Sequence, residues 1–156
     1  MKLFPIGGEV EDFWRQPGRH QRTFETPLKD LPRFVSTIFS NFDIAGCVVT
    51  ITSVVFEPKN LLKLLARHNL LAAPIPSRHE AYVTITAEGH GEAVSLLEAA
   101  LGDWVELILF PSPHDFSIFA DHDERITFFS NDHDTLSTLA AALTGKGFKE
   151  VPGWTR

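Results

Sequence analysis

Three His-Asp pairs lie within residues 113–134 of the chain. They are His114-Asp115, His122-Asp123 and His133-Asp134. Imidazole and carboxylate groups are ligands that Zn²⁺, Mn²⁺ and Fe²⁺ accept, and the same groups serve as general acids and bases in hydrolases. The pairs could therefore form a metal centre or a hydrolase site, or they could be acidic decoration on a β-hairpin.

The residues between the pairs predict that hairpin. FSIFAD and RITFFS form the two strands of the hairpin, around the turn-forming DHDE. Because the turn is five or six residues from the open end, the two ends are roughly 17–20 Å apart at about 3.4 Å per residue. The three pairs therefore cannot all bind one metal ion, and the hairpin has two separate acidic ends.

The open end offers the alternative of a metal-assisted hydrolase, with a divalent metal as cofactor and metal-bound water as nucleophile. Its ligands would be His114, Asp115, Asp132 and His133. The spacing does not match a helical metal motif such as H-E-x-x-H. Helix capping is the favoured interpretation: Asn131 caps the final helix, and Asp132 and Asp134 lie in its first turn. The primary expectation is therefore no cofactor and no metal.

Other catalytic patterns have little support in this chain. Gly89-His90-Gly91 joins a strand to a helix, but the third glycine of a dinucleotide fingerprint is missing because position 94 is Val. No G-x-S-x-G elbow and no phosphate-binding Gly-Lys-Ser/Thr motif occurs. Cys47 is the only cysteine and lies in an apolar run, so we expect a buried thiol and no disulfide.

The net charge of −6 hides a division of the chain. Residues 1–78 contain ten Lys/Arg and seven Asp/Glu, whereas residues 79–156 contain four and thirteen. Between residues 101 and 134, eight acids face the single base Arg125. Such a segment repels nucleic acid and attracts basic proteins. We expect a basic protein partner and neither nucleic acid nor a membrane.

The elements that position these residues follow from periodicity. Helical spacing predicts helices at about 30–42, 58–69, 89–102 and 132–144, and alternation predicts strands at about 47–56, 81–88 and 104–110 in addition to the hairpin. We predict an α+β two-layer sandwich, with a mainly antiparallel sheet, helices on one face, and a C-terminal β-hairpin plus helix. Mixed strand pairing stays open.

The length of 156 residues fits a single domain spanning 1–156. Residues 1–26 are expected to be irregular, and the proline-punctuated segment 72–77 is a candidate connector between subdomains. No apolar run approaches the roughly 20 residues that span a bilayer, and no signal-peptide core forms at the N-terminus. We therefore expect a soluble, cytoplasmic protein.

The strands predict a sheet with two different faces. Val-Thr-Ile-Thr occurs at 49–52 and again at 83–86, so each strand has an apolar face and a threonine face. Glu106, Ser117 and Thr127 could extend the polar face, and Phe110, Phe119 and Phe129 could share it. That face is either a recognition surface or is covered by a helix or the N-terminal segment.

These observations favour a non-catalytic protein-binding module over an enzyme. The concrete hypothesis is an acidic inhibitor or immunity-type protein that neutralises a basic partner such as a nuclease toxin. A monomer and a dimer are both compatible with it. The predicted contact residues are the four of the hairpin tip with a supporting set, namely Asp121, His122, Asp123, Glu124, Glu106, Asp115, Phe119 and Phe129.

Overall fold

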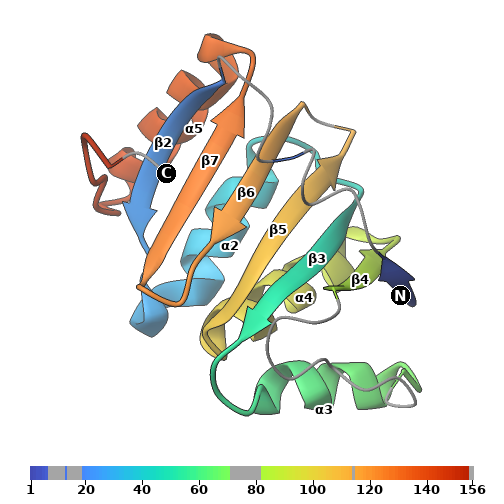
Figure 1. Ribbon diagram of the computed structural model, residues 1–156. Helices are drawn as coiled ribbons and strands as arrows, with labels where there is room; N and C mark the ends of the chain where they lie inside the picture. The colour runs from blue at the N-terminus through green and yellow to red at the C-terminus, as the bar shows by residue number, and fades with distance from the viewer. Residues whose placement is uncertain (7–12, 14–18, 71–81, 114, 155–156) are drawn as a thin grey trace.

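The computed structural model describes residues 1–6, 13, 19–70, 82–113 and 115–154. Within these residues, seven strands form one sheet in the order β1-β4-β3-β5-β6-β7-β2, and every neighbouring pair is antiparallel (Figure 1). The strands are β1 Lys2–Ile6, β2 His20–Glu25, β3 Gly46–Val54, β4 Tyr82–Ala87, β5 Val105–Ser112, β6 Phe116–Ala120 and β7 Arg125–Ser130.

The helices of the described residues cover one face of this sheet. They are η1 Leu28–Asp30, α2 Leu31–Ser40, α3 Lys59–Arg67, α4 His90–Gly102 and α5 His133–Gly145. Figure 1 shows α2, α4 and α5 behind the sheet, with α3 across its lower end. The predicted two-layer α+β architecture, with its C-terminal hairpin plus helix, is confirmed. No helix among the described residues is long and apolar enough to cross a membrane.

The apolar periodicity of the sequence accounts for the main core. In α2, the residues at helical spacing are all buried: Leu31, Phe34, Val35, Ile38 and Phe39. They join the inward residues of α4, α5 and the sheet in one hydrophobic cluster. Burial of this stripe drives the helix onto the sheet, and the proline in the first turn is compatible with the helix because an N–H at that position has no intrahelical acceptor.

The two Val-Thr-Ile-Thr segments are neighbours in the sheet. In β3 and β4, Thr50 lies directly opposite Thr84, and their hydroxyl oxygens are 3.0 Å apart. The flanking Val49 and Ile85 point to the other side, into the main core under the helices. The predicted division into an apolar face and a threonine face is therefore confirmed, although both hydroxyls are buried and paired.

The second face of the sheet carries a continuous row of side chains across six strands. Pairing of neighbouring strands aligns Thr84, Thr50, Ile108, Phe119, Thr127 and Thr23. Above this row, Phe13 packs edge-on against Phe129, with ring centroids 5.5 Å apart. Phe119 and Phe129 are consequently only 1% and 5% exposed. Phe13 thus covers this face from the N-terminal side, and the two rings predicted as contact residues are buried beneath it.

The expectation that residues 1–26 are irregular is also wrong, because β1 and β2 lie within them. β2 pairs with β7, places Phe24 in the main core and joins the hydroxyl of Thr23 to that of Thr127 at 2.9 Å. The opposite edge of β2 contacts the C-terminal segment, where Val151 donates its N–H to the Thr23 carbonyl at 2.7 Å. The candidate connector 72–77 lies outside the described residues.

Candidate functional site

The tip of the β6–β7 hairpin is held by one carboxylate. Asp121 accepts hydrogen bonds from the backbone N–H groups of Asp123 and Arg125, each at 3.0 Å, and its own N–H donates to the Arg125 carbonyl. The residue is only 7% exposed. Asp121 therefore fixes the turn from inside, and its predicted role as an exposed contact residue is corrected by this geometry.

The other acidic residues of the tip face outward around His122. Nδ1 of His122 lies 3.2 Å from Oε2 of Glu106, whose Oε1 accepts a hydrogen bond from the Thr52 hydroxyl at 3.0 Å. On its other side, Nε2 of His122 lies 3.9 Å from a carboxylate oxygen of Asp123, whose side chain is 70% exposed. Glu106 thus orients the imidazole, while Asp123 and Glu124 present their charges to solvent.

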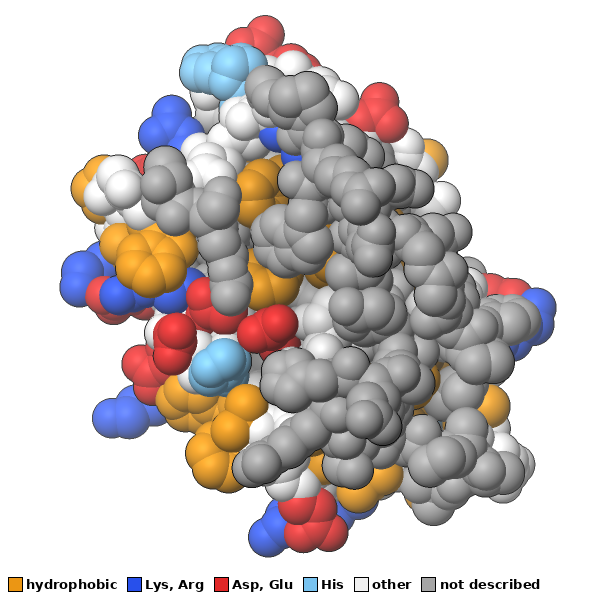
Figure 2. Space-filling view, in the orientation of Figure 1, with side chains coloured by type: hydrophobic (Ala, Val, Ile, Leu, Met, Phe, Trp, Pro, Cys, Tyr) orange, Lys and Arg blue, Asp and Glu red, His pale blue; other side chains and the backbone are white. Residues whose placement is uncertain are grey.

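An exposed apolar pair adjoins this acidic group. Ser53 pairs with Glu106 near the end of β3, and Val55 and Phe56 follow the last residue of that strand, with exposures of 45% and 63%. Figure 2 shows acidic side chains around a histidine with hydrophobic side chains beneath them. We define the tip surface by its six members: Val55, Phe56, Glu106, His122, Asp123 and Glu124.

Sequence reasoning missed the apolar part of the tip surface. The available signal was the position of Phe56 at the end of the strand pattern. Glu57 and Pro58 follow it, so no apolar residue continues the alternation that would indicate burial. Its exposure of 63% became apparent only in the folded structure.

The open end of the hairpin is a helix cap. Asp132 accepts hydrogen bonds from the backbone N–H groups of Asp134 and Thr135, each at 3.1 Å, and from the Thr135 hydroxyl at 2.6 Å. These bonds, the hydroxyl one foremost, lower the pKa of the Asp132 carboxyl. Capping is confirmed, but the cap is Asp132 and not Asn131, because the helix begins one residue later than expected.

The described residues of the candidate metal site have other neighbours. His133 packs edge-on against His20, with ring centroids 5.3 Å apart, and His114 lies outside the described residues. Asp115 is exposed at the rim of a pocket of about 250 Å³ that also contains Arg19. A guanidinium there disfavours a divalent cation. In the described part of the chain, no group of three or more His, Cys, Asp or Glu side chains could hold a metal ion.

Asp115 is also separated from the tip surface. The whole of β6, Phe116–Ala120, lies between Asp115 and the turn. Asp115 therefore cannot share one small contact with Asp123, and the predicted supporting set divides between the two ends of the hairpin and the buried second face.

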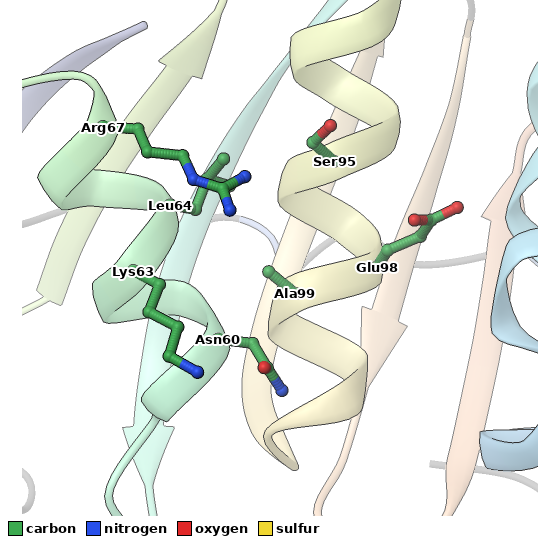
Figure 3. Close-up of a pocket in the computed structure, with 7 residues that line it drawn as sticks. All are labelled: Asn60, Lys63, Leu64, Arg67, Ser95, Glu98 and Ala99. Atoms are coloured by element: carbon green, nitrogen blue, oxygen red, sulfur yellow. The ribbon is translucent and has the colours of Figure 1, made fainter.

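A groove of about 330 Å³ lies between α3 and α4. Figure 3 shows Arg67 reaching from α3 toward α4, whereas Glu98 points away from α3. Burial raises the pKa of the Glu98 carboxyl. The residues described as lining this groove include no histidine and no cysteine, so they supply no imidazole base and no thiol nucleophile. The groove is notable instead for the two cations on α3, Lys63 and Arg67.

The thiol of the single cysteine is buried and unreactive. Cys47 is buried in the main core, and this burial raises its pKa to about 12. Since the thiolate is the reactive form, the native thiol is a poor nucleophile at neutral pH.

In the part of the chain that the structure describes, exposed charge thus gathers at the tip surface and on α3. Comparison of the chain with protein-family models, with curated proteins and with solved structures finds no match.

Proposed function

We propose that this protein is a non-catalytic binding module that neutralises a basic protein partner, most concretely an inhibitor or immunity-type protein for a nuclease toxin. The observation that carries the proposal is the tip surface, which combines the outward carboxylates of Asp123 and Glu124 with the exposed ring of Phe56. Protein interfaces concentrate their binding energy in aromatic anchors surrounded by a polar rim.

A nuclease offers the complementary surface. Its substrate-binding site is basic because it must neutralise phosphates. Carboxylates on a projecting turn would be attracted to such a site and would accelerate encounter, particularly at low salt. Phe56 would then supply the apolar contact that slows dissociation.

The turn is prepared for this role by Asp121. Its two hydrogen bonds hold the backbone of Asp123 and Arg125 before any partner arrives. A loop that is already ordered loses less conformational entropy on binding, so more of the contact energy contributes to affinity. The same proposal places the protein in the cytoplasm, where an inhibitor protects the cell that makes it.

The test is capture of partners from a lysate of the native organism, followed by kinetics with the purified partner. Two baits lose the same amount of charge: Asp123→Asn/Glu124→Asn at the tip and Asp115→Asn/Asp134→Asn at the open end. We expect a basic partner whose association the tip pair slows by about tenfold at low salt, with a weaker salt dependence, and the open-end pair changes little.

The partner must also lose its own activity when the wild-type protein is added. If no basic protein is captured, or if the two charge pairs slow association equally, the tip surface is not the binding site that we propose.

A further inference from the structure

A basic stripe lies next to the tip surface. Lys59, Lys63 and Arg67 follow one another at i, i+4 and i+8 along α3, and all three are exposed. None of them forms an ion pair with another described residue. At 1.5 Å per residue, the stripe extends over about 12 Å. We call these three residues the basic stripe.

The order of the two charged regions along the molecule is simple. The acidic part of the tip surface adjoins the end of β3, the loop with Val55 and Phe56 follows, and α3 begins at Lys59. Figure 1 shows the hairpin turn, this loop and α3 along the lower end of the molecule. Phe56 therefore lies between negative and positive regions.

We propose that two copies of this chain form a twofold dimer in which the basic stripe of each copy covers the tip surface of the other. A twofold axis near Phe56 exchanges the acidic and basic regions, so that the same patch is complementary to itself. Each half of the contact then pairs the exposed carboxylates of Asp123 and Glu124 with the cations of the basic stripe.

The apolar centre of this contact supports the same arrangement. Phe56 and Val55 are the two most exposed of the large hydrophobic side chains in the described residues. In the dimer, the four side chains from the two copies meet at the axis and are buried from solvent. Since the contact has few apolar residues and many charges, the dimer is weak, reversible and sensitive to salt.

The dimer would block the tip surface, which is the site of the proposed function, but its formation does not require that function. The basic stripe occupies the tip surface as a basic partner would, so the partner and the second copy compete. A tighter basic partner converts the dimer into a one-to-one complex.

Charge reversal with the full chain tests the dimer. One variant is Lys63→Glu/Arg67→Glu, and the other is Asp123→Lys/Glu124→Lys; the matched control is Asp115→Lys/Asp134→Lys. Sedimentation equilibrium at low salt should show a dimer for wild type and control, dissociating at high salt. Each reversal alone should raise the dimer Kd by at least about tenfold, because like charges then face each other.

Mixing the two reversed variants gives the decisive result. In the mixture, the reversed α3 charges of the Lys63→Glu/Arg67→Glu variant face the reversed tip of the Asp123→Lys/Glu124→Lys variant. The unchanged acidic tip of the first variant faces the unchanged basic stripe of the second. Opposite charges therefore meet in both halves of the contact, and a heterodimer should form from two monomeric proteins. Circular dichroism checks that both are folded. A wild type that stays monomeric up to about 1 mM at low salt, or a dimer that neither reversal weakens, overturns the inference.

The outcome is separable from that of the proposed function. Partner capture by the Lys63→Glu/Arg67→Glu variant should persist, because its tip surface is intact. Capture without any wild-type dimer would overturn the dimer alone, whereas a dimer without a captured basic partner would overturn the proposed function alone.

Discussion

The replacement Asp121→Ala should cause the largest loss of stability among the acids of the hairpin tip. The carboxylate accepts two backbone hydrogen bonds, from Asp123 and from Arg125, inside a turn that is nearly closed to solvent. Hydrogen bonds to a charged group contribute about 1.5–3 kcal/mol each. Because water can reach part of the emptied turn, we expect a total loss of about 2–4 kcal/mol of unfolding free energy.

Urea denaturation measures this loss directly, provided that the slope of the free energy against denaturant stays constant. In thermal unfolding, the same loss corresponds to a decrease in Tm of about 4–16 °C for a chain of this size. Asp123→Ala is the matched control, since it removes the same charge from an exposed side chain and should change stability by less than about 0.5 kcal/mol. Equal effects of the two replacements would refute the role that we assign to Asp121.

Three further predictions concern buried or capping groups. Asp132→Ala should destabilise the protein at neutral pH, and its difference from wild type in urea denaturation should vanish as the pH falls below 3.8, because the capping carboxyl has a lowered pKa. Native Cys47 should resist a thiol reagent at pH 8. Stability should fall as the pH rises from 9 toward 12, since the unfolded thiol loses its proton first. Thr50→Val should cost about 1–3 kcal/mol by leaving the Thr84 hydroxyl unpaired, whereas the double replacement with Val should cost less, as a double-mutant cycle would show.

Much of the fold could be predicted because its elements have clear periodicity. The stripe of α2 and the alternation of β3 and β4 are long enough to identify without tertiary information. β2 was missed because HQRTFE has only one large apolar residue, Phe24, and its pairing with β7 depends on residues about a hundred positions away. Local pattern carries no signal for such a partner.

The site was only partly predictable for a related reason. The tip acids are evident in the sequence, but their division into an internal brace, Asp121, and outward charges, Asp123 and Glu124, depends on the hydrogen bonds of the folded turn. Likewise, the covering of Phe129 by Phe13 requires a contact between the two ends of the chain. Residue type could indicate acidity and aromaticity, whereas exposure followed from tertiary structure.

The pairing of β2 with β7 also sets the order of events during synthesis on the ribosome. Glu25 aligns with Arg125, and the two are separated by 100 positions in the chain. At about 5–20 residues per second, roughly 5–20 s pass between synthesis of the two strands. During that interval β2 has no partner and Phe24 no core, so the nascent N-terminal segment is a binding target for chaperones. The sheet closes only when the C-terminal hairpin has emerged.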